Sequence, residues 1–214
     1  AHGAMVLGPE IDLRVFAKHW VHAFAVEEAS PDGPKRSLQV FDAAGDAVHK
    51  VHLNPQSNHA LWPDLLANMR LEGQPQTLTL SPRRPVDPAR ANRDSAPALR
   101  AAWNRMTDTH QFIGLAKDHG MNRLGAYRVA GAPYVQRLEP EAVTLTLTQV
   151  ANAAIPVMIF VGNAGCIQIH GGPVERIVPM GPWINVMDPR FNLHLRADRI
   201  AEVYAVWKPT RTGD

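Results

Sequence analysis

The stretch VLGPEIDLR at residues 6–14 has a counterpart, VMDPRFNLH, at residues 186–194. With the same 180-residue offset and no gap, residues 24–26 (FAV) align with residues 204–206 (YAV). Self-similarity at a fixed offset is typical of repeated supersecondary units. We therefore predict a tandem structural repeat, of which this chain holds the back of the first unit and the front of the second, truncated at both ends. A coincidence between two similar strands is the alternative.

A segment rich in proline and arginine separates the two matching ends. Residues 73–98 contain five prolines and four arginines, with no aromatic residue among them. This composition is typical of an extended, hydrated connection, and the missing aromatics disfavour a nucleic-acid surface. We predict three parts: residues 1–72 as the back of the first repeat, residues 73–98 as the inter-repeat linker, and residues 99–214 as the front of the second repeat.

Hydrophobic periodicity and turn residues predict an α+β fold in which each unit is an antiparallel β-sheet with packed helices. Strands are expected at residues 37–41, 47–53, 143–149, 155–161 and 166–170, with turns at 42–46 and 162–165. Helices are expected at residues 60–69, at 98–106, and from about residue 108 to Gly120. The first helix should bury Leu61, Leu65 and Met69, and the second should bury Leu99, Trp103 and Met106.

The composition describes a globular chain with an ordinary charge balance. Hydrophobic residues make up 45%, and 22 Lys and Arg face 20 Asp and Glu, so the charge gives no case for nucleic-acid binding. One cysteine, Cys166, excludes a disulfide framework and a CxxCH haem attachment, and a buried structural thiol is expected there. The longest apolar run, residues 153–161, is too short to span a bilayer, and no signal-peptide pattern is seen. We expect a cytoplasmic protein without membrane insertion.

His110 is the strongest functional candidate among the ten histidines. Asp108 and Gln111 have the spacing of a capping box, which predicts that His110 lies in the first turn of its helix. A helix N-terminus disfavours imidazolium, so this ring is expected to be neutral and able to coordinate a metal. Phe112 belongs to the apolar stripe, so His110 should point away from the core, while Gly114 leaves bare backbone beside it. A surface or capping histidine is the alternative.

Several segments carry a closer likeness: TDTHQF at 107–112, GNAGCIQIH at 162–170, MGPWINVMDPRFNLHLR at 180–196 and IAEVYAVWKPT at 200–210. With residues 7–14 and 36–42, they resemble the HemS/ChuS/PhuS family of cytoplasmic haem-binding proteins, also called hemin-degrading factors. The resemblance covers essentially the whole chain outside the linker. It implies a tandem duplication with haem in a cleft between the repeats.

The resemblance also implies roles for five residues. By position, His110 matches the axial iron ligand, Arg14 the distal-side arginine, and Phe16 a residue that lines the distal side. Arg123 and Lys208 match propionate-binding cations. Haem b would be held non-covalently, and in an enzyme Arg14 and His110 would be the catalytic pair.

Two versions of the function follow from the resemblance, and these residues serve both. A carrier receives imported haem and delivers it to a haem oxygenase, whereas an enzyme opens the ring oxidatively. The implied partners are haem, a haem importer and a haem oxygenase. The sequence leaves open whether the chain also forms a homo-oligomer. The family continues beyond the Lys-Pro-Thr segment with further propionate contacts that this chain lacks. The alternative is a structural or regulatory module that has kept the fold without haem.

Overall fold

A computed structural model describes residues 3–9 and 11–213 as a mixed α+β protein whose strand pairings are all antiparallel within those residues. The strands are β1 Ala4–Leu7, β2 Asp12–Val15, β3 His22–Glu28, β4 Lys35–Phe41, β5 Ala47–His52, β6 Val135–Leu138, β7 Val157–Gly162, β8 Cys166–Gly172, β9 Ile177–Met180, β10 Trp183–Met187, β11 Asn192–Arg196 and β12 Val203–Val206. The helices are α1 Trp62–Met69, α2 Ala96–Asn104, α3 Gln111–Asp118, α4 Arg123–Ala130 and α5 Ala142–Asn152. None of the described helices is long and apolar enough to cross a membrane.

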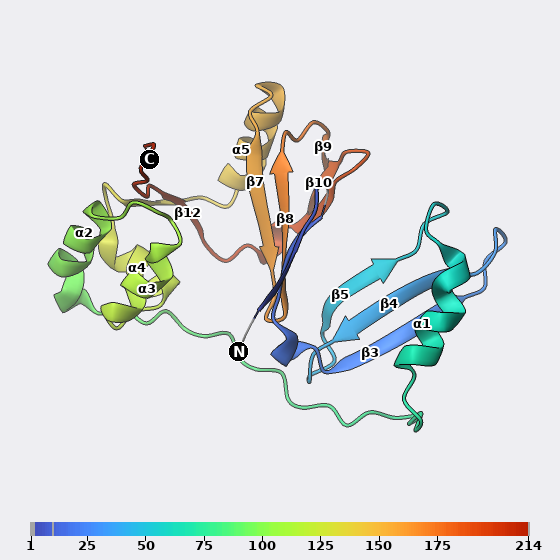
Figure 1. The fold of residues 1–214 in the computed structure, drawn as a ribbon. Coiled ribbons are helices and arrows are strands. Elements are labelled where there is room, and N and C mark those ends of the chain that lie inside the picture. Colours follow the sequence, from blue (N-terminus) through green and yellow to red (C-terminus); the bar gives the residue numbers. More distant parts are fainter. Residues whose placement is uncertain (1–2, 10, 214) are drawn as a thin grey trace. The chain divides into compact units, whose positions relative to one another are not determined.

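The chain divides into two compact units, each discontinuous in sequence (Figure 1). The first unit holds the described residues up to Pro85 together with Val157–Gly172, and the second holds Val86–Pro156 and the residues from Pro173 onward. The predicted division into a first repeat (1–72), a linker (73–98) and a second repeat (99–214) concerns sequence repeats. The compact units do not test it, so it stays a prediction. Its residues 1, 2, 10 and 214 lie outside the described ones.

Two sheets form the first unit, in the orders β1-β2-β8-β7 and β3-β4-β5. Both predicted hairpins are present, and a side-chain oxygen closes each turn. Asp42 Oδ1 accepts the backbone N–H groups of Ala44 and Asp46, each at 2.9 Å. Asn163 Oδ1 does the same for Gly165 and Cys166, also at 2.9 Å. Such turns are local chemistry, which is why the sequence predicts them well.

The core of the first unit is small. Leu13, Val40, Val48 and Cys166 are its buried residues, and Trp20 packs against them and donates its Nε1–H to the Gly165 carbonyl at 2.9 Å. The predicted hairpin turn at residues 162–165 packs tightly against the same core, because a Cβ at Gly165 would lie 2.5 Å from Val48 Cγ1. This close approach ties the β7–β8 turn to β5 and positions the end of β2.

The apolar face predicted for α1 is wrong at two of its three positions, because only Leu65 is half-buried. Leu61 is 57% exposed and Met69 is 66% exposed, whereas Trp62 is the buried residue of the helix. Figure 1 shows α1 running along the β3–β4–β5 sheet, and there the Arg36 guanidinium of β4 lies 5.8 Å from the centre of a Trp62 ring. The large indole, one residue past Leu61, therefore sets the rotation of the helix.

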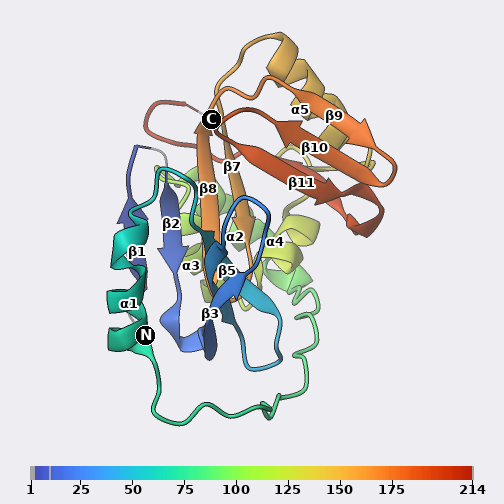
Figure 2. The ribbon, with the colours of Figure 1, turned by 90° about the vertical axis from the view of Figure 1, so that its right-hand side faces the viewer.

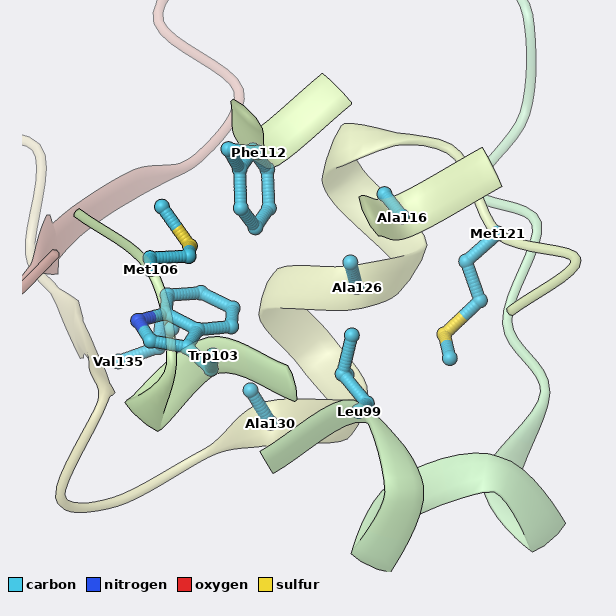
Figure 3. Packing of buried hydrophobic residues seen from close by; sticks show 9 residues of the cluster. All are labelled: Leu99, Trp103, Met106, Phe112, Ala116, Met121, Ala126, Ala130 and Val135. Atoms are coloured by element: carbon cyan, nitrogen blue, oxygen red, sulfur yellow. The ribbon is translucent and has the colours of Figure 1, made fainter. Parts of the chain in front are cut away.

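The second unit contains the larger of the two buried hydrophobic clusters among the described residues (Figure 3). Side chains of α2, α3 and α4 converge there, and the predicted stripe Leu99, Trp103 and Met106 is buried as expected. The Trp103 ring meets the Phe112 ring edge-on at 4.9 Å, and its Nε1–H donates to the Trp207 carbonyl at 2.8 Å. Tight backbone packing accompanies this core, since a Cβ at Gly125 of α4 would lie 1.6 Å from the Arg90 carbonyl oxygen.

Residues 143–149 are helical and not a strand, so that prediction is wrong. The alternating Thr and Leu residues suggested a period of two, but Val143, Leu147 and Ala151 form the half-buried stripe of α5 and Leu145 is 57% exposed. Within the helix, the Thr148 hydroxyl donates to the Thr144 carbonyl at 2.8 Å. Figure 2 shows α5 alongside the β9–β10–β11 sheet, which it contacts at β9. Packing on this sheet selects the helical period over the alternating one.

The two segments that match at an offset of 180 residues form hairpins of the same register. In the first unit Val6 pairs with Leu13 and Met5 with Arg14, and in the second Val186 pairs with Leu193 and Asn185 with His194. A single turn of 3₁₀ helix follows each hairpin, at Ala17–His19 and at Ala197–Arg199. The sequence match therefore corresponds to a matching local fold.

The proline- and arginine-rich segment has no helix or strand between residues 73 and 92, but it is anchored at both ends. The Ser81 N–H donates to the Ala43 carbonyl at 2.7 Å, and Arg83 Nε donates to Asp46 Oδ2 at 2.6 Å. Farther along, the Asn122 amide donates to the Pro88 carbonyl at 2.8 Å and accepts the Arg90 N–H at 3.0 Å.

Candidate functional site

The turn before α3 positions His110. The helix begins at Gln111, so His110 occupies the N-cap position one residue before the predicted first turn. One half of the predicted capping box is formed, because Gln111 Oε1 accepts the N–H groups of Thr107 at 2.9 Å and Asp108 at 3.3 Å. The other half differs from the prediction. Asp108 Oδ1 accepts the His110 N–H at 2.7 Å, while the Gln111 N–H donates to the Asp108 carbonyl at 3.1 Å.

The imidazole of His110 faces away from the core, as predicted. Its side chain is 94% exposed, whereas Phe112 on the opposite side of the helix is 1% exposed. A Cβ built on Gly114 would meet no atom within 4 Å, so the backbone one turn onward is open. This side of α3 is therefore open to solvent at both His110 and Gly114.

A carboxylate holds one nitrogen of this ring. His110 Nδ1 lies 2.7 Å from Asp108 Oδ1, which leaves Nε2 facing solvent. The pKa of Asp108 is lowered from its ordinary value, chiefly by the hydrogen bond from the His110 backbone N–H and then by the bond from its imidazole. Asp108 is thus an ionised acceptor at neutral pH, a role that its cap-like spacing did not suggest.

Lys208 contacts Phe112 of α3 and Tyr127 of α4. Its Nζ is 4.4 Å from the centre of the Phe112 ring and 3.2 Å from the Tyr127 hydroxyl, to which it donates. The Phe112 and Tyr127 rings stack at 5.2 Å. An ammonium over two aromatic faces is held by cation–π attraction as well as by the hydrogen bond.

Arg123 borders a shallow hollow in the second unit. The hollow has a volume of about 510 Å³, and it is lined by Arg123, Tyr127, Ile200, Glu202 and Tyr204 among others. Glu202 accepts hydrogen bonds from Tyr204 and Arg128, which lower its pKa, with the Tyr204 bond the larger cause. Tyr127 lines this hollow and also contacts Lys208 and Phe112, so it connects the hollow with the buried side of α3.

Arg14 and Phe16 belong to the first unit. Arg14 lies on β2 and forms an ion pair with Asp12 on the same face of that strand, with the two side chains 33% and 30% exposed. Phe16 is half-buried, and its N–H donates to the Gly165 carbonyl at 2.9 Å. Sequence reasoning missed Asp12. The available signal was its spacing of two residues from Arg14 within the repeated segment 6–14, because residues two apart on a strand share one face.

Cys166 is a buried thiol, as predicted. It is 4% exposed, and burial raises its pKa, while burial lowers the pKa of His49, whose Nδ1 lies 4.0 Å from the sulfur. Both shifts favour neutral groups, which argues against a thiolate–imidazolium nucleophile. Among the described residues, no group of three or more His, Cys, Asp or Glu could hold a metal ion by itself. An axial haem site needs only one imidazole from the protein.

The second unit therefore carries an exposed imidazole on one side of α3. On the opposite side of that helix Lys208 lies on the Phe112 ring, and Arg123 lines the hollow that Tyr127 borders. An exposed neutral imidazole is able to coordinate a metal, and Arg and Lys side chains are able to pair with carboxylates. Comparison with known families is specific: the haemin-degrading HemS.ChuX domain matches residues 1–69 and 120–214. The chain belongs to this HemS family. His110 falls in the stretch between the two matched segments.

Individual proteins with similar sequences or structures support the same family assignment. The hemin transport protein HmuS of Yersinia pestis is 36% identical over 213 residues, which are 99% of this chain and 61% of that protein. The structure of holo-PhuS, a heme-binding protein from Pseudomonas aeruginosa, matches with a TM-score of 0.89 and 42% identity, covering 99% of this chain and 61% of that one. The structure of ChuS, an Escherichia coli heme oxygenase, matches with a TM-score of 0.81 and 35% identity, covering 100% of this chain and 63% of that one. The chain thus spans less than two thirds of the length of these relatives.

Proposed function

We propose that this chain binds haem b non-covalently, with Nε2 of His110 as the axial ligand of the iron. The observation that carries the proposal is the exposed imidazole whose other nitrogen is engaged by Asp108. Histidine ligands of metals usually donate their second ring N–H to a carboxylate or carbonyl, and this contact has that form. The 42% identity with PhuS of Pseudomonas aeruginosa, a heme-binding protein, supports the choice of ligand.

Arg123 and Lys208 are proposed to pair with the haem propionates. Arginine suits a carboxylate because its planar fork can donate two parallel hydrogen bonds. Lys208 has three donor hydrogens, and its contact with Tyr127 uses one of them, so two stay available for a carboxylate. Arg14 and Phe16 are assigned to the distal side, where the guanidinium would hydrogen-bond a ligand of the iron. For that role Arg14 must share its donors with Asp12.

The protein acts in haem uptake and iron utilisation in the cytoplasm, either delivering haem to a haem oxygenase or degrading it oxidatively. Bound haem supplies an iron that binds dioxygen and a macrocycle that can be opened. In the carrier version a haem importer and a haem oxygenase are the partners. The description of ChuS as a heme oxygenase favours keeping the enzymatic version.

The same proposal includes the architecture. The chain holds the back of one structural repeat and the front of the next, and the two hairpins of equal register at a 180-residue offset support this. The matched family segments on either side of residues 70–119 agree with it.

A hemin titration tests the binding proposal. Wild type, His110→Ala, Arg14→Ala and His52→Ala are compared by their Soret bands, with His52 as a control because it is an exposed histidine on β5. We expect a Soret shift with wild type and His52→Ala, loss of the imidazole-ligated spectrum with His110→Ala, and an altered spectrum with Arg14→Ala. If His110→Ala titrates like wild type, the chain is a module that has kept the fold without this haem site.

The two versions of the function separate in a second measurement. Haem-loaded protein is mixed with a reductant under air, with and without catalase, while the Soret band is followed. Loss of the band that survives catalase indicates enzymatic ring opening. Loss that catalase abolishes indicates bleaching by free peroxide, and a stable band that transfers to a haem oxygenase indicates a carrier.

A further inference from the structure

We propose that Asp108 is a positioning residue that fixes the tautomer of His110, so that Nδ1 carries the proton and Nε2 presents its lone pair outward. For its effect on haem, this inference rests on the proposed function. The tautomer itself is a property of the free protein and can be measured without haem.

The geometry of the contact leaves one arrangement for the neutral ring. Asp108 Oδ1 lies 2.7 Å from the His110 backbone nitrogen and 2.7 Å from Nδ1. An ionised carboxylate only accepts hydrogen bonds, so the ring nitrogen that faces it must be the protonated one. A neutral imidazole has one protonated nitrogen, and Nε2 is therefore the acceptor. Because the side chain is 94% exposed, that lone pair is open to an incoming ligand.

The turn that carries Asp108 is itself held in place. Gln111 Oε1 accepts the N–H groups of Thr107 and Asp108, at 2.9 Å and 3.3 Å. On its other side, the Thr107 carbonyl accepts the Arg211 N–H at 3.2 Å. Two anchors from different parts of the chain thus fix the backbone behind the carboxylate, so the imidazole needs no reorganisation to present Nε2.

The charge of Asp108 adds a second effect to the first. A carboxylate behind an axial histidine raises the basicity of the ligand, and it favours the more highly charged ferric state of a bound iron. Arg211 also acts electrostatically on Asp108 and contributes, as the smallest cause, to its lowered pKa. Fixing the tautomer of His110 requires only a hydrogen-bond acceptor at position 108, whereas the electronic effect on the iron requires a negative charge there. A substitution that keeps the acceptor but removes the charge therefore separates the two effects.

Nitrogen NMR on the haem-free protein tests the orientation. Wild type, Asp108→Ala, Asp108→Asn and the control Asp118→Asn, which alters an exposed carboxylate at the far end of α3, are labelled with ¹⁵N-histidine and measured where the ring is neutral. We expect Nδ1–H for His110 in wild type, in Asp118→Asn and in Asp108→Asn, whose amide oxygen still accepts. Asp108→Ala should return the ring to the Nε2–H form. An Nε2–H ring in wild type overturns the proposal.

Haem complexes of the same variants test the electronic effect. Outer-shell partners of metal ligands typically contribute about ten- to a hundredfold in affinity, and for this exposed pair we expect about a tenfold weaker affinity for hemin in Asp108→Asn. The iron reduction potential should become more positive in Asp108→Asn and stay unchanged in Asp118→Asn. Equal affinity and equal potential in Asp108→Asn and wild type contradict the electronic part. If instead His110→Ala binds hemin like wild type, the haem proposal fails, and the NMR result still decides the tautomer.

Discussion

The β1–β2 and β10–β11 hairpins share one register but differ in what surrounds them. β10 lies between β9 and β11, where Asn185 is 3% exposed and Val186 is fully buried at 0%. β1 is an edge strand, and there the corresponding Met5 and Val6 are 63% and 46% exposed. The same local pairing is therefore compatible with a core strand and with an exposed edge. Neighbouring elements decide which of the two a repeated segment becomes.

The polar residues at matching positions differ in the same way. In the second unit, the buried Asn185 amide donates to the Val178 carbonyl at 2.9 Å, and its oxygen lies 2.7 Å from His194 Nδ1 across the hairpin. In the first unit, Arg14 has Met5 across the hairpin and pairs with Asp12 along its own strand. The hairpin of the second unit uses its polar pair for structure. The first hairpin instead leaves its charged pair partly exposed, at 33% and 30% of the two side chains.

Replacing Asn185 should produce the largest difference between the hairpins. Asn185→Ala removes two hydrogen bonds and leaves a cavity, for an expected loss of about 3 kcal/mol in the free energy of unfolding. Met5→Ala, at the matching exposed position, should change it by less than about 0.5 kcal/mol. Urea denaturation followed by circular dichroism measures both. Equal losses would mean that the two hairpins contribute alike.

A second matched pair isolates the apolar part of the comparison. Val186→Ala removes two methyl groups from a fully buried site, and we expect a loss of about 2 kcal/mol from transfer and cavity terms together. Val6→Ala should cost less than about 0.5 kcal/mol because the side chain is already half in water. The same denaturation experiment applies. A cost at Val6 as large as that at Val186 would show that β1 is covered in solution.

The smallest effect concerns an ion pair that only the second hairpin has. Arg196 donates to both oxygens of Asp198, at 2.7 Å and 2.6 Å, where the first hairpin has Phe16 and Lys18. These hydrogen bonds lower the pKa of Asp198 below its ordinary value of 3.8. A lowered folded-state pKa stabilises the protein above the unfolded value, and this contribution is lost as the pH falls through the folded value.

Asp198→Asn should therefore lower the Tm slightly at neutral pH, and its difference from wild type should vanish below the ordinary aspartate range. The exposed setting keeps the effect small, and salt should reduce it further. Thermal melts of the two proteins across the acidic range measure this. A difference that grows on acidification would contradict the assignment.

The parts of the fold that sequence predicts are those that local chemistry decides. The turns closed by Asp42 and Asn163 were predicted because Asx side chains and glycine act within a few residues. The segment 143–149 was mispredicted because its Thr–Leu alternation fits both a strand and a helix, and packing against β9 decides between them. The rotation of α1 likewise depends on where Trp62 meets β4, which no periodicity encodes.

For the candidate site, the direction of His110 was predictable because the apolar stripe with Phe112 fixes the opposite face of α3. The contact of Asp108 with the ring could not be predicted because the same spacing fits a capping box, and the sequence does not distinguish which N–H the carboxylate accepts. The cation–π contact between Lys208 and Phe112 joins residues that are 96 positions apart in the sequence. A contact over this separation produces no local sequence pattern from which it could be predicted.

Gly125 has a consequence for inheritance. Any side chain there would begin inside the space of the Arg90 carbonyl oxygen, 1.6 Å from its centre, and backbone cannot yield as a flexible side chain does. All glycine codons share their first two bases, so every base change at either of them replaces the residue or ends the chain. The codon for residue 125 is therefore expected to tolerate silent third-base changes and no missense allele at all, alanine included.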